Sequence, residues 1–173
     1  MSRVLHLPFC EQELSSINCG DEVLISGILY VGRDQVHKRL FEAIISGAEL
    51  PFDFNGNAIY YMGPSPAPEG FAIGSAGPTT SARMDPFSPL LLKHGLRVMV
   101  GKGPRSKDVV DAVKEYRGLY LQAYGGCGAL YCSTIKSVES IAYPELGPEA
   151  LIKLEVENFP AFCILDSRGN SFR

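Results

Sequence analysis

The sequence predicts one domain of the α/β class with a mixed sheet. The chain has 173 residues, about the size of one domain, and its 46% apolar and 20% charged residues are ordinary for a globular protein. The apolar run Val23–Val31 predicts a buried strand, and the amphipathic pattern after it predicts a helix. Strand and helix patterns then alternate irregularly, which favours an α/β or mixed arrangement.

The first part of the chain contains the longest predicted strand and helix. Residues 1–19 show no clear period, so we expect an N-terminal arm before a domain at 20–173. Val23–Val31 is rich in Val, Ile and Leu, as buried strands are. The next helix is expected to begin with Asp34 as its N-cap and to end at Gly47. Its apolar face consists of Val36, Leu40, Phe41, Ile44 and Ile45.

Shorter elements fill the rest of the chain. The proline-rich stretch 63–70 predicts a loop, because proline cannot lie inside a sheet, and 74–84 predicts a small-residue loop that leads into a short helix. Ser88 and Ser106 are expected to cap two further helices. Further strands are expected at 58–62, 71–73, 97–100, 119–122, 135–143 and 161–166, and a hairpin turn at 166–170.

Charge and composition argue against several function classes. The net charge of −3 offers no basic excess for nucleic acid. No apolar stretch approaches the ~20 residues of a membrane span, and the N-terminus lacks the apolar region of a signal peptide, so we expect a cytoplasmic protein. The five cysteines include no C-x-x-C pair, and the three histidines show no ligand spacing, so no metal site is expected in this chain.

Residues suited to chemistry follow three of the predicted strands, where ligand sites of α/β sheets collect. In the first segment, the guanidinium of Arg33 is suited to bind a carboxylate through two hydrogen bonds. Asp34 and His37 lie about one helical turn apart, so they can pair. The alternative is a helix cap with solvated charges.

The second segment, Gly74–Arg83, has small residues that let a ligand approach the backbone, and Arg83 adds a positive charge. The alternative is a tight turn, and the phosphate-loop pattern G-x-x-x-x-G-K-[ST] does not occur. In the third segment, Lys102 stands between two glycines and can meet an anion, the alternative being a turn lysine in water. Arg33, Arg83 and Lys102 together predict a pocket for a small dicarboxylate.

The glycines of Gly125–Gly128 predict close backbone packing or a hinge, with a structural role for Cys127.

Three motifs occur in a fixed order: R-D-x-x-H-K-R at 33–39, G-S-A-G-P-T-T-S-x-R-M at 74–84 and G-K-G at 101–103. With G-D-E-V at 20–23 and N-F-P-A at 158–161, they resemble the iron–sulfur hydro-lyase family. The resemblance is to the β subunit, or C-terminal domain, of class I fumarate hydratase and L-tartrate dehydratase. It covers the chain from about residue 20 to its end.

This resemblance implies a swivelling β/β/α fold and an α subunit as partner. The α subunit of the family carries a four-iron four-sulfur cluster on its own cysteines, so this chain alone would bind no cofactor and would be inactive. The implied reaction is the reversible hydration of fumarate to L-malate, or the dehydration of tartrate to oxaloacetate. An assembly of two α and two β subunits is expected.

The resemblance also implies residue roles. Thr79 matches the proposed base, and its hydroxyl needs stabilisation of its alkoxide, which Arg83 and Lys102 can supply. Substrate carboxylates would be bound by Arg33, Arg83 and Lys102, with Asp34, His37 and Thr80 in support, the first two orienting Arg33.

Fumarate is the expected substrate, and the tartrate enzyme is the alternative. A stand-alone dicarboxylate-binding module without catalysis and a purely structural domain are the other hypotheses.

Overall fold

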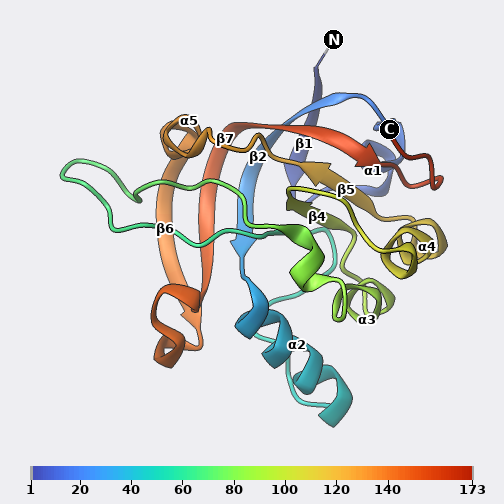
Figure 1. Ribbon diagram of the computed structural model, residues 1–173, viewed down its shortest axis with the longest axis horizontal. Helices are drawn as coiled ribbons and strands as arrows, with labels where there is room; N and C mark the ends of the chain where they lie inside the picture. The colour runs from blue at the N-terminus through green and yellow to red at the C-terminus, as the bar shows by residue number, and fades with distance from the viewer. Residues whose placement is uncertain (1, 173) are drawn as a thin grey trace.

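The computed structural model describes residues 2–172 as one mixed sheet with helices against it (Figure 1). The strand order is β1-β2-β3-β4-β5-β7-β6. The strands are β1 (Arg3–Leu7), β2 (Glu22–Val31), β3 (Ala58–Tyr60), β4 (Val98–Gly101), β5 (Leu119–Gln122), β6 (Ile135–Ala142) and β7 (Leu151–Leu165). The helices are α1 (Glu11–Ser16), α2 (Asp34–Ser46), η1 (Ser81–Met84), α3 (Ser88–Lys93), α4 (Lys107–Tyr116), α5 (Gly128–Thr134) and η2 (Pro144–Glu149).

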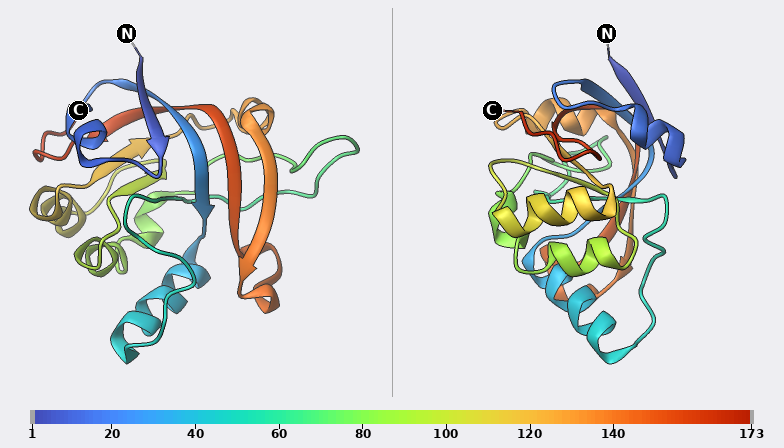
Figure 2. Two further views of the ribbon diagram at one scale, coloured as in Figure 1. Left: turned by 180° about the vertical axis from the view of Figure 1, so that it is seen from behind. Right: turned by 90° about the vertical axis from the view of Figure 1, so that its right-hand side faces the viewer.

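The first five strands are parallel, each to its neighbour in the sheet. Their carboxyl ends therefore lie at one edge, from which the loops after β2, β3 and β4 emerge. Helices α2, α3 and α4 gather on one side of the sheet, as the right-hand view of Figure 2 shows. The α/β class with a mixed sheet is thus confirmed.

The long strand β7 closes the sheet on itself. It runs antiparallel to β2 on one side, and on its other side it pairs first with β6 and then with β5. Because β2, β3, β4 and β5 already pair in order, β7 completes a five-stranded, barrel-like ring. Two cores result: one inside the ring, around Leu29, Tyr60 and Phe159, and one under the helices, around Leu40 and Tyr120.

The segment expected to form an N-terminal arm contains β1 and α1. β1 pairs with β2 over five residues, and Leu5 and Ile17 are fully buried in the inner core. Only alternate residues of β1, Leu5 and Leu7, face that core. A short edge strand of this kind has a weak apolar pattern, which is why no period was evident in the sequence.

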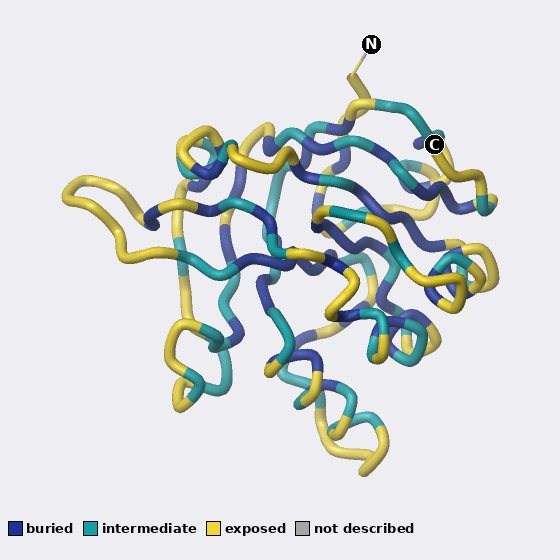
Figure 3. The backbone as a smooth tube through the Cα atoms, in the orientation of Figure 1, coloured by how far each residue is buried: buried dark blue, intermediate teal, exposed yellow. Residues whose placement is uncertain are grey.

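Three details of the predicted elements are corrected. Residues 71–73 form no strand: they lie in the returning part of the projecting loop, most of which is exposed in Figure 3. The side chain of Phe71 is 58% exposed. β7 begins at Leu151 rather than at residue 161, because Asn158 lies beside a bulge that keeps the strand continuous. The short helix α5 was not predicted.

Among the described residues, no helix has both the length and the apolar character to cross a bilayer.

A substitution at Gly27 tests whether β1 and β2 must approach each other closely at this position. Its φ is +114°, and a Cβ there would lie 2.3 Å from the carbonyl oxygen of Leu7. We expect Gly27→Ala to lower the free energy of unfolding by about 2 kcal/mol or more, because steric overlap adds to backbone strain. Gly47→Ala is the control: its φ is +71° with nothing within 4 Å, so we expect a loss of about 1 kcal/mol. Urea unfolding measures both, and equal losses would contradict the prediction.

Candidate active site

The candidate site is built from the loops that follow β2, β3 and β4. Arg33 lies two residues after β2, and Lys102 directly follows β4. The loop that contains Thr79 runs beside the end of β3, since the Thr79 N–H donates to the carbonyl oxygen of Tyr61 at 2.7 Å. The three segments singled out in the sequence therefore meet at the carboxyl edge of the parallel strands, where ligand sites of such sheets form.

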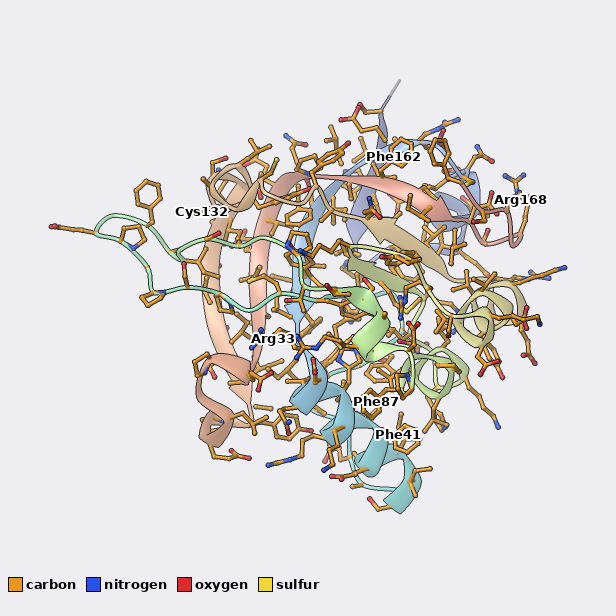
Figure 4. All side chains as sticks on the ribbon, in the orientation of Figure 1. Arg33, Phe41, Phe87, Cys132, Phe162 and Arg168 are labelled. Carbon is orange, nitrogen blue, oxygen red and sulfur yellow. The ribbon has the colours of Figure 1, made fainter. Side chains whose placement is uncertain are left out.

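Arg33, labelled in Figure 4, is the N-cap residue of α2. Its guanidinium lies against the backbone of Gly63. A Cβ at Gly63 would lie 2.7 Å from both Cζ and Nη1 of Arg33, so a larger residue there would displace the guanidinium from this position. Nη2 of Arg33 lies 3.3 Å from Oε1 of Glu149. Its Nε is buried and has no hydrogen-bond partner.

Asp34 holds Arg83 rather than Arg33. Both Nε and Nη2 of Arg83 donate to Oδ2 of Asp34, at 2.9 and 2.7 Å. Asp34 is the first residue of α2, so the prediction that it is the N-cap is wrong. The ion pair joins the first residue of α2 to η1 across 49 residues of sequence, which fixes Arg83 beside the helix that Arg33 caps. Oδ1 of Asp34 is buried without a partner.

His37 is completely buried and does not pair with Asp34, contrary to the pairing considered from the sequence. Its Nδ1 lies 2.8 Å from the carbonyl oxygen of Arg33, and its ring meets Tyr61 edge-on at 5.1 Å. Burial, with the nearby Arg105 charge, lowers the pKa of His37 to about 4, although the Arg33 carbonyl and Asp34 oppose the shift. The ring is therefore neutral, Nδ1–H donates, and Nε2 is left as an acceptor without a partner.

Thr80 and Lys102 join the second and third segments directly. They form a parallel β-bridge, and Ser81 N–H donates to the Lys102 carbonyl oxygen at 2.8 Å. A Cβ on Gly101 would lie 2.1 Å from Ser81 Oγ, so this glycine permits the close approach. Thr79 is half-buried, whereas the side chains of Thr80 and Lys102 are exposed. The site is therefore an open surface and presents one wall to a ligand.

A buried ion pair beneath these loops was missed. Arg105, whose side chain is 1% exposed, donates through Nε to Asp85 Oδ1 at 2.7 Å and through Nη2 to Ser88 Oγ at 2.8 Å. Its guanidinium also lies 4.9 Å from the centre of the Tyr120 ring. Ser88 is consequently not a helix cap, because its hydroxyl donates to Met84. In the sequence, Pro104 next to Arg105 was the one indication that this loop has a fixed backbone.

The glycine-rich segment supports the loop that carries Thr79. Ala76 N–H donates to the Gly128 carbonyl oxygen at 3.3 Å, and a Cβ on Gly128 would lie 2.0 Å from Ser75 Oγ. The predicted close backbone packing is confirmed here. Cys127 is the half-buried N-cap residue of α5, which agrees with a structural role.

Within residues 2–172, the buried side-chain polar atoms without a hydrogen-bond partner are Arg33 Nε, Asp34 Oδ1 and His37 Nε2. All three residues lie at the start of α2. Buried polar atoms are nearly always paired, so these three atoms are the positions near the site where a further hydrogen-bond partner would be accommodated. The edge combines these atoms with three cationic side chains and a hydroxyl.

Comparison with known proteins places almost the whole chain in one family. A family model described as "Fumarase C-terminus" matches residues 3–173.

Three relatives show how the match is distributed. "Fumarate hydratase class I, anaerobic" of Escherichia coli (strain K12) is 44% identical over 162 residues, which are 92% of this chain and 30% of that protein. "Fumarate hydratase 2" of Leishmania major is 45% identical over 92% of this chain and 28% of that protein. The "Putative L(+)-tartrate dehydratase subunit beta" of Methanocaldococcus jannaschii is 37% identical over 93% of this chain and 86% of that protein. The chain thus spans less than a third of the fumarate hydratases.

Removing the buried arginine tests whether it holds the loops of the site. We expect Arg105→Ala to lower the free energy of unfolding by about 3 kcal/mol, because Asp85 would lose its buried partner. Lys107→Ala removes a neighbouring ion pair whose lysine is 87% exposed, and should keep the wild-type unfolding midpoint. Urea unfolding compares the two variants, and an unchanged midpoint for Arg105→Ala would contradict this role.

The low pKa of His37 predicts a pH dependence of stability. Below the ordinary histidine pKa of 6.5 the unfolded chain binds a proton that the folded chain excludes until about pH 4, so stability falls as the pH drops through this range. We expect His37 to contribute a loss of about 2 kcal/mol between pH 7 and pH 5. His37→Asn should lack this contribution while its amide still donates to the Arg33 carbonyl. Urea unfolding of both proteins at pH 7 and pH 5 tests this prediction. An equal change in the free energy of unfolding for the wild type and His37→Asn would refute it.

Proposed function

The chain belongs to the fumarase C-terminus family, and on this basis we propose that it is the β subunit of an iron–sulfur-dependent hydro-lyase that hydrates fumarate to L-malate reversibly. One observation carries the proposal. The segments of Arg33, Thr79, Arg83 and Lys102 meet at a single open edge of the sheet, beside buried polar atoms that lack partners.

The fumarate hydratases support fumarate as the substrate, and the tartrate dehydratase subunit supports the role of a β subunit. The two fumarate hydratases are 44% and 45% identical to this chain, whereas the tartrate dehydratase subunit is 37% identical. That relative is named a β subunit, and this name supports the proposal of an α partner. Tartrate dehydration is therefore the second candidate activity.

In the proposed reaction, three cations bind the substrate through its carboxylates. Hydration and dehydration of such acids pass through a state in which negative charge grows on the carboxylate beside the reacting carbon. Fixed positive charges at Arg33, Arg83 and Lys102 stabilise that charge more than they stabilise the ground state. Arg83 is already oriented by its two hydrogen bonds to Asp34, so little ordering is needed when substrate binds.

Thr79 is the proposed base. An unassisted hydroxyl is a weak base, and the positive charges of Arg83 and Lys102 favour its alkoxide form. Its N–H bond to Tyr61 and the adjoining Thr80–Lys102 bridge hold the loop on the sheet edge. His37 positions Arg33 through the carbonyl bond, while Asp34 positions Arg83.

The proposal assigns the cluster to the α partner. Among residues 2–172, no group of three or more His, Cys, Asp or Glu side chains is placed to hold a metal. Cys163, for example, is buried with its Sγ on a backbone carbonyl. The residues of this chain thus do not fit the cluster, and the roles proposed for them are substrate binding, orientation and proton transfer.

The expectations of a swivelling domain, an α2β2 assembly and a cytoplasmic location accompany this proposal. If no α partner exists, the alternative is that the chain binds a dicarboxylate without catalysing a reaction.

The proposal is tested with the anaerobically purified complex of this chain and its α partner. We expect Thr79→Ala to lower kcat on L-malate and fumarate by about 100-fold or more, because the base is lost. Thr79→Ser keeps a hydroxyl and should retain much of the activity. Intact complex and cluster absorbance must accompany the loss.

A wild-type complex that turns over neither fumarate, L-malate nor tartrate would overturn the hydro-lyase proposal. Turnover of tartrate alone would select the second candidate. A Thr79→Ala complex as active as the wild type would place the base elsewhere.

A further inference from the structure

Arg33 already faces a carboxylate of its own chain. Nη2 of Arg33 lies 3.3 Å from Oε1 of Glu149, and the side chains of both residues are about three-quarters buried. Glu149 belongs to none of the motifs that carry the family resemblance. It lies 116 positions further along the chain than Arg33, so the fold brings it to the site.

Glu149 reaches the site on η2, the connection between β6 and β7. The last strand pair before this connection is Ala142 with Leu151, and the segment between them packs against α2 (Figures 1 and 4). Tyr143 and Gly147 both have left-handed φ values, +57° and +58°, which bend the chain back on itself. The bend lets a hairpin connection present an acidic side chain to the helix.

A second ion pair holds the same segment independently. Nη1 of Arg39, one and a half turns along α2, donates to Oε1 of Glu145 at 2.9 Å, and its guanidinium lies 5.4 Å from the centre of the Tyr143 ring. The connection therefore stays on α2 without the contact between Arg33 and Glu149. A change at Glu149 alters the charge at Arg33 and leaves this anchor in place.

The two arginines of the site differ in how firmly they are paired. Arg83 donates both Nε and Nη2 to Asp34, at 2.9 and 2.7 Å. Arg33 meets Glu149 through Nη2 alone, at 3.3 Å, and its Nε has no partner. A carboxylate that engaged Nη1 and Nη2 together would form the stronger, bidentate pair. An incoming carboxylate can thus improve on Glu149, whereas it has little to gain by replacing Asp34.

We propose that Glu149 is a placeholder carboxylate. It neutralises Arg33 when no ligand is bound, and a carboxylate of the dicarboxylate displaces it. The inference rests on the proposed function for the class of ligand. Any ligand that binds at Arg33 must break the Arg33–Glu149 contact, so Glu149 weakens the binding of all such ligands. A ligand with a carboxylate replaces the lost contact, and Glu149 thereby favours carboxylates over other ligands. Glu149 is a specificity-determining residue in this scheme.

The experiment titrates succinate, an unreactive dicarboxylate, into the 173-residue chain and follows binding by NMR. We expect Glu149→Gln to bind succinate about two- to fivefold more tightly than wild type, the range that a partly exposed ion pair of up to about 1 kcal/mol allows. Glu145→Gln is the matched control, because it removes the same charge from the same segment at the Arg39 pair. It should bind succinate as the wild type does.

Equal or weaker binding by Glu149→Gln would overturn the placeholder, as would an equal gain in Glu145→Gln, which would point to net charge alone. An unchanged urea midpoint of Glu149→Gln shows that the fold is kept. Turnover by the complex with the α partner is a separate readout. Activity on fumarate with an unchanged KM in Glu149→Gln would keep the proposed function and remove the placeholder. If Glu149→Gln bound succinate more tightly but the wild-type complex turned over no substrate, the placeholder would stand and the proposed function would be refuted.

Discussion

The pairing of β7 with both β2 and β5 is the constraint on which the other parts of the molecule depend. Without it, β2 to β5 would form an open parallel sheet with its inner face uncovered. With it, the inner side chains, such as Leu29 and Phe159, fill a closed ring, and the outer face is left for the helices. The bulge beside Gly27 and Asn158 lets two long antiparallel strands curve enough to close the ring.

That closure leaves the carboxyl edge of the parallel strands to the candidate site. Arg33 and Lys102 lie within two residues of a strand end, so the positions of β2 and β4 determine where these two cations lie. The longer loop that carries Thr79 is held at the same edge by its hydrogen bond to Tyr61 and by the Thr80–Lys102 bridge. The buried pair of Arg105 and Asp85 then fixes the loop after β4 against the end of η1. Its burial between Tyr61 and Tyr120 explains why an open surface can still hold a defined geometry.

Elements with a strong local pattern could be predicted from the sequence. Val23–Val31 and the helix capped by Ser106 are examples, and the Ser106 side chain does accept the Val109 N–H. β1 and the first half of β7 could not be predicted, because their strand character comes from partners distant in sequence. The same limit applies to the site. The first and third segments follow strand ends as predicted, but the strand expected at 71–73 before the second segment does not form. The partner of Asp34 is 49 residues away, and no spacing rule identifies it.

The strand that closes the ring, β7, is also the last in sequence of the strands within residues 2–172. β2 therefore waits for a partner more than 120 residues further along, and during synthesis its edge and that of β5 stay unpaired until β7 has left the ribosome. Contacts of such sequence separation form slowly, and unpaired strand edges are sites of aggregation. A chain interrupted before β7 would lack its ring entirely. Folding of the ring is therefore tied to the arrival of one strand, β7, rather than to the strands that precede it.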